Sequence, residues 1–360
     1  MKRFSIPMPA RYAINTGLLV LFLIVGQLVM GSGILPRAHN NNIIQVGFFI
    51  ILAVSLNLST GYLGQLPLGH AGFMAVGAYT GAIFWRSGIL PGYASVAAGL
   101  FLAGVVAAIF GIIIGIPALR LRGDYLAIIT LGFGEIIRVL INNIPGVTGG
   151  AQGLLGIPRY SSFLVVYICV IISCLVIHTL MKSRHGRAIL SIRENEIAAE
   201  SCGIQTTYYK VMAFAVSAFF AGVAGALFAG NLGILVPGEF DFMTSINILM
   251  IVVLGGMGSM AGAAIAAAIL TSLPLLMQDL AHIRGIDYLP YGAQEPVRYA
   301  LTWIAQNRMI IYALMLIIVM IFKPSGLLGN HDFSLSRILE RIIRRFRGEK
   351  AVKGGEDHGA

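Results

Sequence analysis

The chain has 360 residues, of which 57% are hydrophobic and only 11% are charged, and its mean hydropathy is +0.85. A soluble domain carries about 25% charged residues, so this composition excludes an ordinary soluble globular protein. The formal net charge of +10 would favour nucleic-acid binding in a soluble protein, but in a membrane protein it is explained by basic cytoplasmic loops, and no nucleic-acid partner is expected.

Apolar runs of about 20 residues recur along the chain, and runs of this length are typical of transmembrane helices. The period-two alternation of a transmembrane barrel is not visible in the sequence. The runs predict an all-α polytopic membrane protein with about ten transmembrane helices, some of them short or broken. The predicted spans are residues 14–35, 43–62, 66–86, 93–119, 125–143, 163–181, 209–231, 245–257, 259–277 and 309–323.

The two ends of the chain predict its orientation. The first run, 14–35, is long for the apolar region of a signal peptide, so we interpret it as a first span that begins in the cytoplasm. The chain after Lys323 is as basic as the N-terminus, which places both ends in the cytoplasm and requires an even number of spans. Residues 1–330 then form one transmembrane domain, and residues 331–360 form a cytoplasmic basic amphipathic helix and tail suited to an anionic membrane surface.

A predicted helix break lies in GYLGQLPLGHAGFMAVGAYTGA, residues 61–82. Small residues allow helices to approach closely, and glycine and proline together predict a discontinuous helix. The expected positions of the break are Gly64, Pro67 and Gly69. Backbone groups freed by such a break must face protein or water, so the segment is a candidate for a substrate path.

Four polar residues in the spans are candidates for lining that path. Asn57 precedes the break, and Gln65 and His70 lie within it. The fourth is Glu135, which shares a helix face with Arg138 three residues later. Ionisable residues inside a span are costly and are functional candidates by default. The alternatives are that His70 is a packing histidine and that Glu135 and Arg138 form an ion pair that locks helix packing.

The densest acidic cluster in the middle of the chain is RENEIAAESCGI, residues 193–204, within a predicted cytoplasmic loop at 182–208. Asn195 is a suitable N-cap and Gly203 a suitable C-terminal stop for a helix of about two turns between them. A short acidic helix of this kind is either a solvated loop or a docking helix for a soluble partner.

Two later segments complete the predicted organisation. A second segment rich in small residues, like the predicted break, is LGGMGSMAGAAIAAAI, residues 254–269. At its start, VLGGMGSMAGA is expected to form a tight turn. Two interrupted segments in the two parts of a chain favour an internal repeat of the kind found in transporters. Residues 278–308 are expected to form a periplasmic loop with some structure of its own.

The sequence has no motif for nucleotide hydrolysis or metal binding. No lysine follows a glycine, so there is no G-x-x-x-x-G-K-[ST], and neither G-x-S-x-G nor H-E-x-x-H occurs. Cys169, Cys174 and Cys202 fit neither a metal site nor a disulfide framework. We therefore expect a protein that is not an enzyme and carries no metal or other cofactor.

Several stretches together resemble the permeases of branched-chain amino acid ABC importers, in the LivM-type branch of that family. The resemblance runs from about residue 45 to 330. The stretches that carry it are GYLGQLPLGHAGFMAVGAY (61–79), RGDYLAIITL (122–131), TGGAQGL (148–154), GRAILSIRENEIAAESCGI (186–204), VLGGMGSMAGA (253–263) and FKPSGLLG (322–329).

The resemblance implies a permease domain at residues 1–330 that works within a complex of several subunits. Family permeases pair with a homologous second permease, bind two cytosolic ATPase subunits that hold the ATP, and receive substrate from a periplasmic solute-binding protein. It implies the bacterial inner membrane and transport by alternating access. The positions that match the family's cytoplasmic coupling loop are Glu194, Asn195, Glu196, Ala199 and Gly203.

One position departs from the family pattern, and it leaves the substrate less certain than the fold. Pro67 stands where a serine is usual, which puts the local geometry of the break in doubt. The alternatives are a permease for urea or short amides within the same family, and a stand-alone channel or secondary transporter. The last of these would be expected to carry several acidic residues in its spans, and only Glu135 qualifies.

Overall fold

The computed structural model describes residues 8–33, 36–121 and 123–280, with a few single positions between 303 and 326. Helices make up most of this part of the chain, and two short strands within it form one two-stranded ladder. The helices and strands are α1 (Met8–Gly31), α2 (Arg37–Asn57), the π-helix η1 (Leu58–Tyr62), α3 (His70–Arg86), α4 (Gly92–Ala118), α5 (Asp124–Asn142), α6 (Pro145–Thr148), the 3-10 helix η2 (Gly150–Gln152), β1 (Leu154–Leu155), α7 (Phe163–Lys182), α8 (Arg184–Glu194), α9 (Glu196–Ser201), α10 (Thr206–Leu232), β2 (Ile234–Leu235), the 3-10 helix η3 (Pro237–Phe240), α11 (Phe242–Gly255) and α12 (Met260–Leu280).

The protein is an all-α polytopic membrane protein. Within the described residues, four helical stretches are long and apolar enough to cross a membrane. They are Arg37–Tyr62, Gly92–Ala118, Phe163–Lys182 and Thr206–Leu232, and shorter apolar helices cover Leu19–Gly31, Phe242–Gly255 and Met260–Leu276. Each of the first nine predicted spans has a helix in the structure, whereas most of 309–323 and all of 331–360 lie outside the described residues.

Two boundaries differ from the sequence prediction. The span predicted at 66–86 begins as a helix only at His70, because the chain around Pro67 and Gly69 is irregular. The loop predicted at 278–308 starts later, since α12 continues to Leu280, and the rest of that loop lies outside the described residues.

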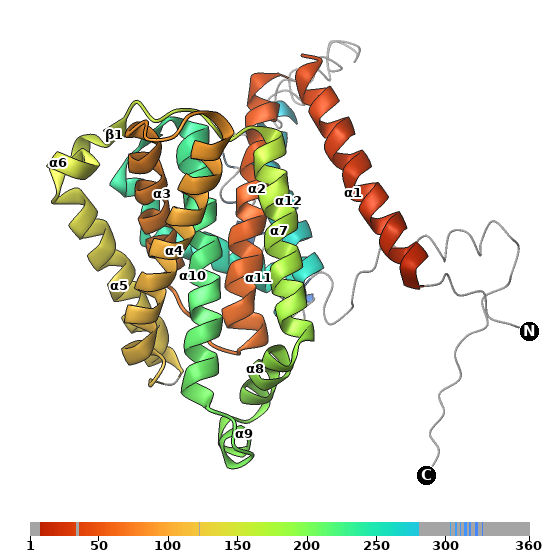
Figure 1. Cartoon of the computed structure of the whole chain (residues 1–360), viewed down its shortest axis with the longest axis vertical. Helices are drawn as coiled ribbons and strands as arrows, with labels where there is room; N and C mark the ends of the chain where they lie inside the picture. The colour runs from red at the N-terminus through yellow and green to blue at the C-terminus, as the bar shows by residue number, and fades with distance from the viewer. Residues whose placement is uncertain are drawn as a thin grey trace, which may run out of the picture.

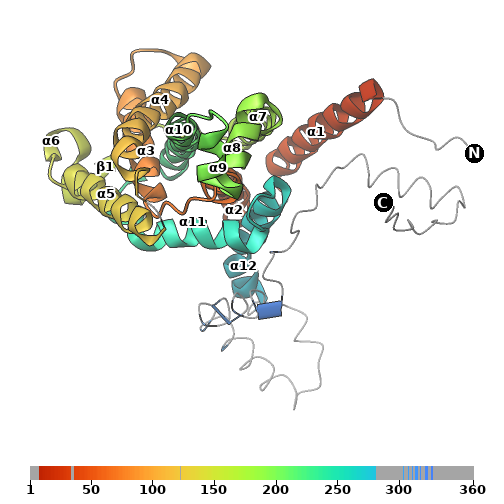
Figure 2. The same ribbon diagram turned by 90° about the horizontal axis from the view of Figure 1, so that it is seen from below.

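Helix α10 forms the centre of the bundle. It packs against α3, α4 and α2, and Figure 2 shows it enclosed by them. Small residues permit this approach, because a Cβ at Gly77 of α3 would overlap the backbone of Gly222 of α10. On its other side, a Cβ at Gly222 would meet the Ala103 carbonyl and the Ala107 side chain of α4.

The two ends of the bundle are built differently (Figure 1). At one end β1 pairs antiparallel with β2, with Leu154 opposite Leu235 and Leu155 opposite Ile234. At the opposite end α7 leads into α8 and α9 before α10 returns through the bundle. The first is called the β1 end below and the second the α9 end.

Candidate functional site

The α9 end presents the short acidic helix that the sequence predicts. Asn195 has an extended backbone and its side-chain oxygen accepts a hydrogen bond from the Ala198 N–H at 3.1 Å, which caps α9 as expected. Gly203 takes a φ of +83° just after the helix and its N–H donates to the Glu200 carbonyl, so the predicted stop is also confirmed. Ala199 faces inward, and Ile197 on the same helix is 65% exposed.

An ion pair fixes α9 to α10. The Nζ of Lys210 donates to Oε1 of Glu196 at 2.7 Å, and the two side chains are 4% and 26% exposed. A buried lysine requires a partner, and Glu196 supplies one from a helix that makes few other contacts with the bundle. The acidic residue therefore orients α9 relative to α10.

Arg193, directly before this helix, reaches back into the bundle. Its Nη1 donates to the Gly61 carbonyl at 3.0 Å, while Nε and Nη2 donate to Oε1 of Glu194 at 3.1 and 2.6 Å. Gly61 lies in η1, 132 residues earlier in the chain. The α8–α9 corner is thus bonded directly to the helix break.

The break itself runs from η1 to the start of α3, and Gly64 within it has a φ of +77°. Its freed backbone groups find partners on several elements, as a break inside a membrane domain requires. The Leu68 N–H donates to Oγ1 of Thr130 on α5, and the Ala71 N–H donates to Oγ of Ser245 on α11, both at 3.0 Å. The hydroxyl groups of α5 and α11 therefore cap the N-terminus of α3.

Asn57, at the start of the break, joins it to the turn between α11 and α12. Its Nδ2 donates to the Ser259 carbonyl at 3.0 Å and its Oδ1 accepts from the Gly258 N–H at 2.9 Å. The turn occupies the predicted tight-turn segment, with positive φ at Gly256 and Gly258. Because Asn57 is fully buried and its amide is bonded at both atoms, it acts as a clamp between two interrupted segments.

The other two polar candidates at the break differ in how they are bonded. His70 is 2% exposed, and its Nε2 lies 3.0 Å from Oγ of Ser55, whose carbonyl accepts from Oγ of Ser217 at 2.6 Å. This chain of contacts links α3, α2 and α10. Gln65 has a buried Oε1 with no hydrogen-bond partner among the described residues, and the same holds for Oγ of Ser59.

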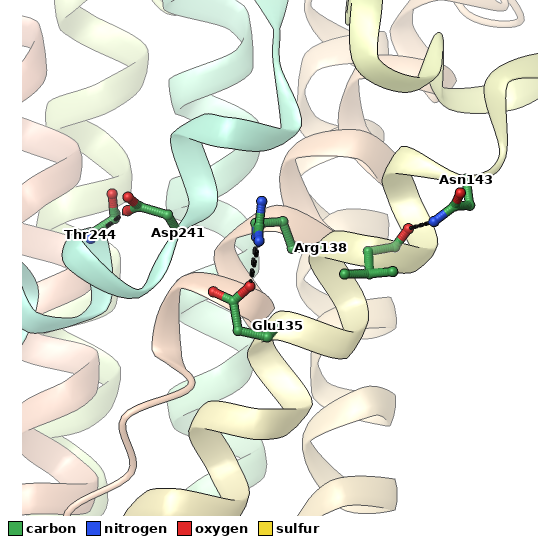
Figure 3. A network of polar contacts seen from close by, with 6 residues as sticks. Glu135, Arg138, Asn143, Asp241 and Thr244 are labelled. Carbon is green, nitrogen blue, oxygen red and sulfur yellow. Dashed lines mark hydrogen bonds and ion pairs between the residues drawn. The ribbon is translucent and has the colours of Figure 1, made fainter.

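Glu135 and Arg138 form an ion pair on α5, in which Nε and Nη2 of Arg138 both lie 2.7 Å from Oε2 of Glu135. The side chains are 33% and 36% exposed, so the pair is not enclosed by this chain. Figure 3 shows it on the side of α5 that faces the start of α11, where Asp241 accepts from the Thr244 N–H at 2.8 Å. If α5 crosses the membrane, as the sequence predicts, an exposed ion pair on it must meet water or another polar surface rather than lipid.

The predicted residues come from two places in the chain. Asn57, His70 and Gln65 lie at the break, whereas Glu135 lies on α5, whose residue Gly134 packs against Gly69 of the break. Arg193 and Lys210, which hold the α8–α9 corner, were not predicted as site residues. The one signal in the sequence is that each is a basic residue within or close to the acidic cluster at 193–204, which indicates an ion pair but not the Gly61 contact.

Comparison with known proteins shows that the chain matches one protein family. Residues 40–320 match the family described as "Branched-chain amino acid transport system / permease component". The chain is 40% identical over 273 residues to the high-affinity branched-chain amino acid transport system permease protein LivM of Salmonella typhimurium (strain LT2), and equally to that of Escherichia coli (strain K12). These matches cover 64% of this chain and 61% of each LivM protein.

A second type of permease is also similar. The chain is 25% identical over 307 residues to the high-affinity branched-chain amino acid transport system permease protein LivH of Escherichia coli (strain K12). That match covers 79% of this chain and 92% of LivH. The similarity thus extends beyond LivM to a second type of permease with this description.

Proposed function

Because the chain belongs to the family of branched-chain amino acid transport system permease components, we propose that it is the membrane subunit of an ATP-driven importer for branched-chain or related amino acids. The LivM relatives, of which this chain spans about three-fifths, support the substrate class. The proposed location is the bacterial inner membrane, with both termini in the cytoplasm.

The observation that carries the proposal is the construction of the α9 end. A capped helix projects there with Ile197 and Glu200 exposed, and its inner side is held by the Glu196–Lys210 ion pair. An exposed apolar residue on a rigidly held acidic helix suits docking into a groove of a soluble partner. We assign the coupling role to the motif Glu194, Asn195, Glu196, Ala199 and Gly203. Within it Asn195 and Gly203 cap the helix, and Glu196 and Ala199 hold its inner side against the bundle.

The partners follow from this role. Two cytosolic ATPase subunits bind ATP and hold α9, a homologous permease completes the membrane unit, and a periplasmic solute-binding protein delivers the amino acid. The permease itself binds no cofactor and hydrolyses no ATP. Transport proceeds by alternating access, in which movement of the ATPase subunits shifts α9 and opens the path on one side of the membrane at a time.

The proposed path includes Gln65 and His70 at the break and Glu135 on α5, whereas Asn57, the fourth predicted residue, has both amide atoms bonded and holds the break in place. Gln65 has an acceptor without a partner, which suits a changing hydrogen-bond environment. The exposed Glu135–Arg138 pair offers both charges that the zwitterionic head group of an amino acid requires.

The test is co-purification followed by ATPase measurement. The tagged chain, expressed with its sister permease and ATPase subunits, should retain the ATPase, and a branched-chain amino acid with its binding protein should raise ATP hydrolysis. Ile197→Asp should release the ATPase. The matched control is Val147→Asp on α6, a 55% exposed apolar residue on a short helix at the β1 end, which should retain it. Retention by both variants would contradict docking through α9, and stimulation by urea or short amides alone would replace the substrate class.

A further inference from the structure

Arg193 differs from the other arginines of α8. All three arginines are exposed, Arg193 by 37% of its side chain, but only the Arg193 side chain is seen to turn back onto the break, where it donates to the Gly61 carbonyl. Its Cγ lies so close to Gly64 that a Cβ there would stand 2.8 Å away, and its Nη1 approaches Gly258 within van der Waals distance of an added Cβ. One side chain thus touches the docking corner, the break and the α11–α12 turn.

The hydrogen bond from Arg193 has a physical reason. Gly61 lies near the C-terminal end of the continuous α2–η1 helix, where carbonyl groups lack intrahelical partners and a cation is favoured by the helix dipole. A guanidinium has five donors in a fixed planar array, so it binds the Gly61 carbonyl and the Glu194 carboxylate at the same time. A lysine ammonium cannot reproduce both contacts in one plane.

The contacts continue without a gap beyond Gly61. Asn57 lies one turn earlier in the same helix and is bonded to the backbone of Gly258 and Ser259. A displacement of the α8–α9 corner therefore pulls on the Gly61 carbonyl, and through Asn57 on the α11–α12 turn. A coupling role requires such a contiguous set of contacts between elements that can move.

We propose that Arg193 is the positioning residue that transmits movement of the α8–α9 corner to the helix break at 57–69 and to the α11–α12 turn. This inference rests on the proposed function, since the movement is imposed by the ATPase. Arg193 does not touch the transported solute. It acts through the Gly61 carbonyl, and its loss separates ATP hydrolysis from transport while leaving ATPase binding intact.

The test compares Arg193→Gln, Arg193→Lys and the exposed control Arg187→Gln in the assembled importer in lipid vesicles. Three quantities are measured for each: ATPase retained, solute-stimulated hydrolysis, and solute molecules moved per ATP. Arg193→Gln should retain the ATPase but transport roughly fivefold less solute per ATP or worse. Arg193→Lys should recover part of this loss, and Arg187→Gln should match the native chain.

A second measurement follows the break directly. Leu66, 46% exposed within it, is replaced by cysteine in a Cys202→Ser background, and its alkylation rate is compared with and without a trapped ATP analogue. The rate should change about fivefold in the chain with Arg193 and hardly at all with Arg193→Gln.

Several outcomes would overturn the proposal. These are native transport per ATP in Arg193→Gln, loss of ATPase binding in both Arg193 variants, and a Leu66→Cys rate that ignores nucleotide in the chain with Arg193. Failure of the proposed function looks different, because the native chain itself would then neither retain an ATPase nor take up solute.

Discussion

Lys210 and Glu196 lie 2.7 Å apart, nitrogen to oxygen, and only 4% of the Lys210 side chain is exposed. The lysine belongs to α10, the central helix, and the glutamate to α9, which otherwise packs mainly against α8. This buried charge and its partner are therefore the main link from α9 to the central helix.

Removal of the Glu196 charge should destabilise the protein. Glu196→Gln leaves the Lys210 ammonium buried and uncompensated, and the loss of one partner of a buried ion pair costs roughly 3–5 kcal/mol. Glu196→Gln should lower the midpoint of thermal unfolding in detergent. The double variant Glu196→Gln with Lys210→Met should regain most of the lost midpoint temperature. The control is Glu200→Gln, because Glu200 is exposed on the same helix. An unfolding midpoint for Glu196→Gln equal to that of this control would show that the pair contributes nothing.

The Asn57 clamp should be worth more than a single hydrogen bond. Asn57→Ala leaves the partly buried Gly258 N–H unpaired, at a cost of about 1–3 kcal/mol, and removes one of the two hydrogen bonds to the Ser259 carbonyl, which also accepts from the Ala263 N–H. Asn42→Ala on the same helix loses one partly buried contact, to Oγ of Ser272, and serves as the control. Unfolding in detergent should show a larger loss of stability for Asn57→Ala than for Asn42→Ala. Equal losses of stability would mean that the turn does not depend on Asn57.

The Glu135–Arg138 pair allows a test between path and packing. If it meets the substrate, Glu135→Gln, Arg138→Gln and the double variant should all lower uptake of labelled leucine by about tenfold, since a hydrogen bond between charged groups is worth roughly 1.5–3 kcal/mol. We expect the KM of uptake to rise in all three. Recovery of native uptake in the double variant would instead assign the pair to helix packing.

Gly77 and Gly132 each lie near the middle of a helix, but replacement by alanine should change the stability of the protein in opposite directions. In Gly77→Ala the new methyl group meets the Gly222 backbone, and overpacking of this kind costs about 1–3 kcal/mol. Gly132 on α5 has no atom within 4 Å of the added methyl group, so Gly132→Ala should gain up to about 1 kcal/mol from helix propensity. Thermal unfolding in detergent measures both. A loss in Gly132→Ala would reveal that a second chain packs there.

The native cysteine at the α9 end reports orientation. Cys202 is exposed, and the proposed topology puts it in the cytoplasm, so a membrane-impermeant maleimide should label it in inverted vesicles and not in intact cells with a permeable outer membrane. Val147→Cys at the β1 end, made in a Cys202→Ser background, should be labelled in intact cells and not in inverted vesicles. Labelling of Cys202 from outside would invert the topology.

The features that could be predicted from the sequence are those determined by neighbouring residues: the spans, the helix caps and the helix break. The run at 93–119 became α4 almost to the residue, because a span is set by continuous hydrophobicity. Asn195 and Gly203 were recognised as caps because capping is decided within a few residues. The interruption before α3 was predictable for the same reason, since Gly64 and Pro67 act on their own backbone.

What the sequence could not predict were contacts between distant segments. Arg193 reads as one more base on a charged loop, and nothing local pairs it with Gly61, 132 positions away. Asn57 reads as a polar residue free to meet a solute, yet both of its amide atoms are held by a turn 201 and 202 residues later. Tertiary packing decides such partners, and residue type alone does not.

The β1 end has a mechanical consequence. The ladder between β1 and β2, the hydrogen bond from the Ile157 N–H to Gly233, and that from Oγ of Ser161 to Leu227 all join the segment between α5 and α7 to the segment around the end of α10. At the α9 end, the links to the break are a few side chains. Because backbone hydrogen bonds join the segments at the β1 end, we expect a displacement of α9 to shift the α8–α9 corner and the break more than the β1 end.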